Sequence, residues 1–156
     1  SDSPTPEIVY SIGINELEPN GARTGGYRLG KFSFKQFARP NLDNDYPIVR
    51  LGDVHLMHAE ATARAAGNWA LALPEVNAIR ARANVSALSS LTAEQFLAER
   101  GREMFQEASR RTDLIRFGKW NDSWWEKTNS DAYRTVFPIP SEQLTANSSL
   151  SQNTGY

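Results

Sequence analysis

Acidic and basic side chains alternate over residues 99–116 at spacings that could support acid–base chemistry. Glu99, Glu103 and Glu107 recur every four residues, which would place them on one face of a helix. Two carboxyl groups about 5 Å or about 6.5–9.5 Å apart can cleave a glycosidic bond, provided that one of them is protonated. Arginine partners lower the pKa of a carboxyl group and keep it ionised, which opposes that role. We therefore predict no catalytic residue and interpret the stretch as a structural ionic network of Glu99, Arg100, Glu103, Glu107, Arg110, Asp113 and Arg116.

Two histidines, His55 and His58, form an H-x-x-H pattern on a predicted helix. A zinc-protease helix instead places its histidines four residues apart around a glutamate. The sequence has no cysteine and no third histidine, and helical geometry does not direct Asp53 or Glu60 toward both rings. We expect no metal site, no cofactor, and histidines that are partly buried and hydrogen-bonded.

Adjacent tryptophans in a polar loop are the third chemical signal. Trp124 and Trp125 lie in a predicted surface loop over residues 119–135, with amides and acids on both sides and Trp120 shortly before. An exposed ring stacks on the apolar face of a sugar while polar neighbours bind its hydroxyls. The same pair could instead anchor the loop to the core. Trp120, Trp124 and Trp125 are therefore weak candidates for ligand contact.

The composition excludes several classes of partner. The chain has 156 residues and a formal net charge of −1, which suits one domain with one core. A nucleic acid or an anionic membrane would require a clustered basic surface. No apolar run approaches the roughly 20 residues of a membrane span, and no signal-peptide pattern is present. We therefore expect no nucleic-acid partner.

The first 45 residues are predicted to be irregular with short strands. Apolar residues alternate over residues 8–14, which is the period of a strand, and residues 27–37 are a second extended candidate. Between them, Pro19-Asn20-Gly21 and Gly25-Gly26 are typical of turns.

Residues 49–83 predict a helical hairpin. The first helix runs over residues 49–66, Gly67 ends it in a left-handed conformation, and Asn68 can cap the next helix. Pro74 predicts either a kink or a later start of that second helix. The expected buried face of the first helix consists of Leu51, Val54, Met57, Ala61 and Ala65. That of the second helix consists of Trp69, Leu73, Val76, Ile79 and Ala83. So short a connection makes the helices antiparallel neighbours, and the pair resembles a single tetratricopeptide unit.

A third helix is predicted from Thr92 to about residue 110. Thr92 and Gln95 have the spacing of a capping box. Gly101 lies on the expected apolar face and indicates a close contact there. That face is Leu97, Gly101, Met104, Phe105 and Ala108. A short turn over residues 113–117, an extended segment over 135–140 and a polar tail follow.

Three blocks of sequence, taken together, resemble the SusD/RagB family of surface glycan-binding lipoproteins of Gram-negative bacteria. The first is residues 46–61, and the second is residues 99–118 with the pattern E-R-x-x-E-x-x-x-E-x-x-R-x-x-D-L-I-R-x-G. The third combines Phe137-Pro138-Ile139-Pro140 with Gln152-Asn153-Thr154-Gly155-Tyr156. The resemblance covers roughly residues 28–156.

The resemblance implies a mainly α fold, with a tetratricopeptide-like hairpin, a third long helix, short strands and extended loops. It implies that residues 46–156 form the C-terminal helical region of a longer protein, after an irregular segment over residues 1–45. It further implies an outer-membrane protein, lipid-anchored through an N-terminal region outside this chain. Such a protein binds an oligosaccharide or polysaccharide and delivers it to a TonB-dependent, SusC-like transporter. The alternative is a tetratricopeptide-like module that binds a protein or peptide and no sugar.

Overall fold

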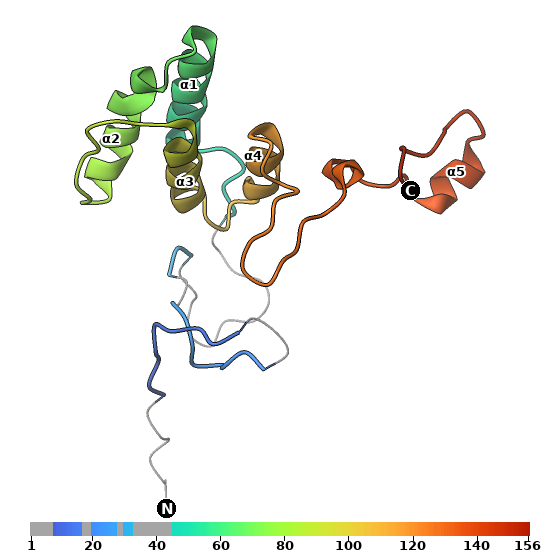
Figure 1. Cartoon of the computed structure of the whole chain (residues 1–156), viewed down its shortest axis with the longest axis horizontal. Helices are drawn as coiled ribbons and strands as arrows, with labels where there is room; N and C mark the ends of the chain where they lie inside the picture. Colours follow the sequence, from blue (N-terminus) through green and yellow to red (C-terminus); the bar gives the residue numbers. More distant parts are fainter. Residues whose placement is uncertain (1–7, 17–19, 28–29, 33–44) are drawn as a thin grey trace, which may run out of the picture. The chain divides into compact units, whose positions relative to one another are not determined.

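The computed structural model describes residues 8–16, 20–27, 30–32 and 45–156, and this part of the chain is mainly helical (Figure 1). It contains five α-helices: α1 (Leu51–Ala66), α2 (Leu73–Arg82), α3 (Ala93–Glu103), α4 (Arg110–Arg116) and α5 (Ser141–Ala146). Two 3-10 helices, η1 (Trp69–Ala72) and η2 (Ala132–Thr135), precede α2 and α5. No helix in these ranges is long and apolar enough to cross a bilayer.

The chain divides into two compact units. The first contains residues 1–45 and 123–128, and the second, the helical unit, contains residues 46–122 and 129–156. Within the first unit, the predicted strand over residues 8–14 is reduced to an isolated bridge between Ser11 and Gly25. A strand needs a partner for several successive backbone groups, whereas among the described residues of this segment the backbones of Ser11 and Gly13 are the ones bonded to the turn that ends at Gly26. The candidate strand over residues 27–37 lies largely outside the described residues.

The α1–α2 hairpin forms as its local sequence predicts. Gly67 ends α1 with a φ of 62°, and the Asn68 side chain accepts a hydrogen bond from the Ala70 amide at 3.1 Å. Pro74 lies in the first turn of α2, where its missing N–H is tolerated, so the predicted later start of the second helix is confirmed. α1 packs against both η1 and α2.

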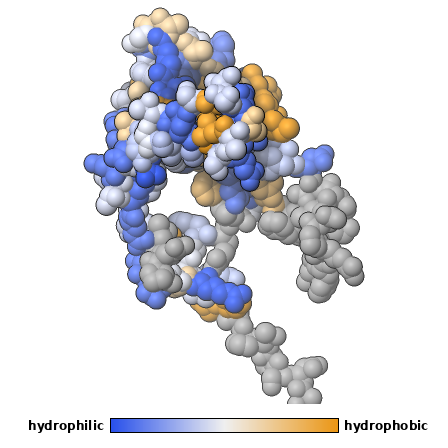
Figure 2. Space-filling view, turned by 90° about the vertical axis from the view of Figure 1, so that its right-hand side faces the viewer, coloured by the Kyte–Doolittle hydropathy of each residue, from blue (hydrophilic) through white to orange (hydrophobic). Residues whose placement is uncertain are grey.

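The predicted buried face of α1 is wrong. Leu51, Val54 and Met57 are exposed, whereas Leu56 and its helical neighbours Ala59, Ala63, Asp53 and Glu60 are buried. The prediction counted apolar side chains only, but two carboxylates belong to the face that packs inward. Space-filling atoms coloured by hydropathy show apolar side chains reaching the surface among polar ones (Figure 2).

The core of the helical unit joins the hairpin to α3, and Phe117, the residue after α4, packs against it. Its buried members are Leu56, Ala59, Ala63, Ala72, Val76, Leu91, Phe96 and Met104. Trp69 lies beside this core, with its ring centroid 5.2 Å from that of Phe96 and 5.7 Å from that of Phe117. The predicted role of Trp69 as a packing residue therefore agrees with its position.

α3 is shorter than predicted. The capping box is confirmed, since Thr92 and Gln95 exchange side-chain and backbone hydrogen bonds. The helix ends at Glu103 rather than near residue 110, because Gln106 and Ala108 adopt positive φ values of 63° and 57°. A left-handed residue cannot continue a right-handed helix. The chain turns over residues 104–108 and restarts as α4.

The polar tail fastens the extended segment over residues 136–139. The Gln152 amide donates to the Ile139 carbonyl at 2.9 Å and accepts from the Ile139 amide at 2.8 Å. Asn153 donates to the carbonyl of Phe137, and the Tyr156 hydroxyl donates to that of Val136. α5 lies between these two segments and was not predicted from the sequence.

Candidate functional site

The centre of the ionic network is the pair of Arg100 and Asp113. Arg100 on α3 lies 2.8 Å from Asp113 on α4 and 2.8 Å from Asp53 on α1. Asp113 is 0% exposed, and Arg100 and Asp53 are also buried. Charges are stable in such surroundings when they are paired, so these contacts hold three helices in one arrangement.

Glu60 extends the network along α1. It accepts from Arg116 at 2.7 and 2.9 Å and from Arg64 at 2.7 Å, while Arg116 also contacts Asp113 at 2.7 Å. Burial acts to raise the pKa of Glu60, but the hydrogen bonds from Arg116 and Arg64 outweigh it and the pKa is lowered. The hydrogen bond to Glu60 is the main cause of the raised pKa of Arg116.

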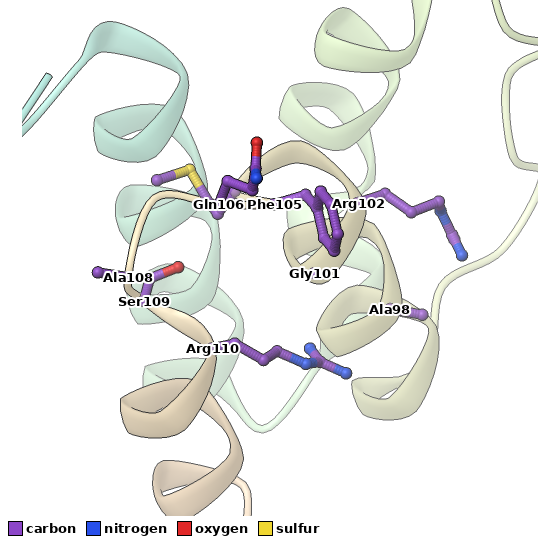
Figure 3. Close-up of a pocket in the computed structure, with 9 residues that line it drawn as sticks. Ala98, Gly101, Arg102, Phe105, Gln106, Ala108, Ser109 and Arg110 are labelled. Atoms are coloured by element: carbon purple, nitrogen blue, oxygen red, sulfur yellow. The ribbon is translucent and has the colours of Figure 1, made fainter. Parts of the chain in front are cut away.

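A second branch connects the start of α1 to the end of α3. Arg50 contacts Glu107 at 2.6 Å and Glu103 at 2.5 Å, and these bonds raise its pKa, the one to Glu107 most strongly. Glu107 lies in the turn after α3, which ends at Glu103, and Figure 3 shows this turn leading into α4. The prediction that Glu99, Glu103 and Glu107 share one helical face is therefore wrong for Glu107. Arg82 of α2 also contacts Glu103, at 2.6 Å.

Glu99 and Arg110 complete the predicted set. Glu99 contacts Arg80 of α2 and Arg102 of α3, each at 2.5 Å. Arg110 differs, since its guanidinium donates to the Leu97 carbonyl at 2.8 Å. Every other arginine of the predicted set is bonded to a carboxylate.

Sequence reasoning missed the partners that the network draws from α1 and α2. These are Arg50, Asp53, Glu60, Arg64, Arg80 and Arg82. The charged residues at positions 50, 53 and 60, within the block of residues 46–61, were the available signal, because their spacing of three and seven places them on one side of a helix. As a whole, the arrangement bonds its carboxylates to arginines of other segments, which suits a structural role rather than proton transfer.

The two histidines lie on the exposed side of α1, so the expectation that they are partly buried is wrong. His58 hydrogen-bonds Glu75 of α2, and the Nδ1 atom of His55 lies 3.6 Å from the same carboxylate. The side chains are 51% and 70% exposed for His55 and His58. Among the described residues, no cluster of three or more His, Cys, Asp or Glu side chains could hold a metal ion.

Trp124 and Trp125 lie at a tight turn in the first unit. The backbones of Trp124 and Lys127 exchange two hydrogen bonds of 3.1 and 2.9 Å, and Glu126 adopts a φ of 60° within the turn. Trp124 is 46% exposed and Trp125 is 50% exposed. The Lys127 ammonium lies 4.2 Å from the centroid of the Trp124 ring. The turn thus presents two indole rings at the surface beside charged groups.

Trp120 belongs to the helical unit and has a different environment. Its indole nitrogen donates to the Arg134 carbonyl at 3.1 Å. The Arg111 guanidinium lies 5.0 Å from the Trp120 centroid and 4.1 Å from that of Phe137. These contacts connect Trp120 to the segment over residues 132–137, so its ring packs against other parts of the helical unit.

Most of the ionic network lies in two of the sequence blocks on which the resemblance rests, residues 46–61 and 99–118. Comparison with known proteins identifies the class of protein. A sequence model of the SusD family matches residues 7–134, so the chain belongs to the SusD family. Over 124 residues it is 33% identical to the starch-binding protein SusD of Bacteroides thetaiotaomicron. That alignment covers 73% of this chain and 22% of the relative, so the chain spans about a fifth of the relative's length.

Proposed function

We propose that this chain takes part in binding an oligosaccharide or polysaccharide at the surface of the outer membrane. Its role is capture and delivery to a TonB-dependent, SusC-like transporter, without cleavage of the glycan. The observation that carries the proposal is membership of the SusD family together with identity to a starch-binding relative.

The exposed pair of tryptophans supports a direct contact with sugar. Trp124 and Trp125 present indole surface at a hydrogen-bonded turn, next to Glu126 and Lys127, whose polar groups can bind hydroxyls. Stacking on aromatic rings with a few polar contacts is the usual chemistry of an uncharged sugar site. A rigid turn also reduces the entropy lost when the rings meet a ligand.

The pairing of acids with arginines supports binding without catalysis. A glycosidase acid must be protonated near neutral pH, and its environment must raise its pKa. In the ionic network the pKa of Glu60 is instead lowered, by its hydrogen bonds to Arg116 and Arg64. Glu99, Glu103, Glu107 and Asp113 each lie within 2.8 Å of an arginine nitrogen. The helical unit is thereby a stable scaffold, one surface of which would meet the transporter.

Titration of the chain with maltoheptaose and with other purified oligosaccharides, followed by tryptophan fluorescence and calorimetry, tests the proposal. Because the relative is a starch-binding protein, maltoheptaose is the first ligand to use. We expect the double variant Trp124→Ala/Trp125→Ala to bind at least about tenfold more weakly, since each ring loses its stacking contact. Tyr27→Ala is the matched control, because it removes another exposed aromatic ring of the same unit.

Unchanged affinity in the double variant would remove these tryptophans from the site. Release of new reducing ends from the bound glycan would contradict the assignment as a binding protein. Failure of every glycan to bind, combined with binding of peptides, would favour the interaction-module alternative.

A further inference from the structure

In the first unit, an asparagine followed by a glycine leads into the turn that ends at Gly26. This pair, Asn20-Gly21, is the one Asn-Gly pair in the sequence, and both of its residues are exposed. Glycine has no side chain to hinder its backbone nitrogen from approaching the preceding side chain, and its backbone adopts conformations that other residues avoid. The amide group of Asn20 is therefore open to attack by the chain itself.

The side chain of Asn15 bonds the backbone on both sides of Gly21. Its Nδ2 atom donates to the Asn20 carbonyl at 3.3 Å, and its Oδ1 atom accepts from the Ala22 amide at 3.2 Å. The Asn20 carbonyl and the Gly21 nitrogen belong to the same peptide group. Asn15 therefore holds in place the peptide group whose nitrogen would attack, and it contacts the oxygen of that group directly.

The two groups that would react are not engaged elsewhere in the described part of the chain. Within those residues, neither the side-chain amide of Asn20 nor the N–H of Gly21 is hydrogen-bonded. Asn84 is also exposed, but the residue after it is Val85, whose N–H donates to the Arg80 carbonyl at 2.9 Å. The stiff β-branched side chain of valine further hinders an approach of its backbone nitrogen. Asn84 is thus a matched exposed asparagine without the reactive arrangement.

We propose that Asn20 is a site of spontaneous deamidation, which converts it to aspartate and isoaspartate. A base in the solvent removes the proton of the Gly21 N–H, and the nitrogen forms a bond to the Cγ atom of Asn20. The bond from Cγ to the side-chain nitrogen then breaks, and this nitrogen takes a proton from water and leaves as ammonia. Water opens the resulting succinimide ring at either of its carbonyl carbons, giving aspartate or isoaspartate. Water is the only co-reactant, and nothing is oxidised or reduced.

Asn15 is a positioning residue that speeds this reaction. Removal of the Gly21 proton leaves a negative charge that is shared with the Asn20 carbonyl oxygen, and a hydrogen bond to the charged form favours that form. The Nδ2 atom of Asn15 supplies this bond. In the isoaspartate product the backbone is longer by a methylene group, so the Asn15 side chain no longer spans from the residue-20 carbonyl to the Ala22 amide. The modification adds a negative charge to this segment and is independent of glycan binding.

Incubation of the full chain at mildly alkaline pH, followed by peptide mapping with mass spectrometry, tests the inference. The mass change from NH2 to OH gives the modified fraction at each asparagine over time. We expect Asn20 to deamidate at least about tenfold faster than Asn84, because valine follows Asn84. Gly21→Val should lower the rate at Asn20 to that at Asn84. Asn15→Ala should lower the rate at Asn20 about threefold or more, through loss of one hydrogen bond.

Incubation in concentrated urea separates the contribution of the fold from that of the local sequence. In the unfolded chain, the parent and Asn15→Ala should deamidate at equal rates, because Asn15 no longer lies at the Asn20 carbonyl. Equal rates at Asn20 and Asn84 in the folded parent chain would overturn the modification site, and this comparison needs no variant. A folded Asn15→Ala chain that reacts as fast as the parent, or a difference that persists in urea, would overturn the positioning role of Asn15.

Discussion

Arg100 and Asp113 show what individual charges contribute to this protein. Both side chains are buried, and Arg100 lies between two carboxylates on different helices. Transfer of ions out of water is unfavourable, and their mutual attraction offsets this only when the geometry is maintained. Loss of one partner leaves an uncompensated buried charge, which is more destabilising than the absence of the whole pair. The network therefore favours one arrangement of α1, α3 and α4 over its alternatives.

Glu60 gives this network a measurable dependence on pH. Its pKa is lowered from an ordinary value of 4.5, so its stabilising contribution is present above that value. The contribution is lost as the pH falls through the lower pKa of the folded state, because the unfolded chain then binds the proton more readily. We expect the free energy of unfolding to fall less steeply in Glu60→Gln than in the parent chain as the pH is lowered through 4.5, the ordinary pKa of the group.

Urea unfolding at a series of pH values measures this difference. Glu94→Gln is the matched control, because Glu94 is exposed and its nearest cation, the Lys119 ammonium, lies 3.9 Å away. Identical slopes in the Glu60 variant and the parent chain would show that Glu60 is not perturbed by its arginines.

The end of α3 is decided by two residues that are not glycine. Gln106 and Ala108 are left-handed, and together they separate α3 from α4. An uninterrupted helix would carry Glu107 along α3, whereas the turn allows it to contact Arg50. The caps at Gly67 and Thr92 are local features and follow from residue type, but this interruption depends on contacts that are distant in sequence.

Ala108→Gly should stabilise the protein by about 0.5–1 kcal/mol. The substitution removes the steric conflict of a Cβ atom at a φ of 57°, which exceeds the extra backbone entropy that glycine brings to the unfolded chain. Chemical denaturation with urea, followed by circular dichroism, measures the change.

Ala98→Gly provides the matched control, because Ala98 lies inside α3 with ordinary helical geometry. It should destabilise the protein by about 1 kcal/mol. A loss of stability in Ala108→Gly similar to that of the control would show that residue 108 is not left-handed in solution.

The helical unit depends on a core to which α1, η1, α2 and α3 contribute buried side chains, with Phe117, just after α4, packed against it. Phe96 on α3 is 0% exposed and contacts Trp69 of η1, whereas Leu51 on α1 is 71% exposed. We expect Phe96→Ala to destabilise the unit by about 3–5 kcal/mol, because it removes a large ring and leaves a cavity. Leu51→Ala should change stability by no more than about 0.5 kcal/mol. Urea unfolding monitored by far-ultraviolet circular dichroism measures both.

The pair of variants also distinguishes the observed packing of α1 from the one that its sequence suggests. A large loss of stability in Leu51→Ala would mean that the face with Leu51, Val54 and Met57 is buried in solution. The structure places Leu56 and Ala59 there instead.

The sequence by itself determined the features that depend on neighbours within a few residues. The glycine and asparagine at the hairpin, the capping box at Thr92 and the delayed start of α2 at Pro74 all follow from backbone chemistry at single positions. The family resemblance likewise followed from linear motifs, and the comparison with known proteins confirmed it.

Only the tertiary structure decided which face of α1 packs inward and where α3 ends. The inward face includes Asp53 and Glu60. Their burial is favourable only because Asp53 pairs with Arg100 and Glu60 pairs with Arg116, and both arginines lie on helices more than 40 residues later in the sequence. A prediction from hydrophobic periodicity places those carboxylates on the solvent-facing side of the helix, because an unpaired carboxylate is unstable when it is buried. The exposure of Trp124 and Trp125 and the bond from Arg110 to the Leu97 carbonyl were likewise decided by the tertiary structure, because the fold sets which groups a side chain meets.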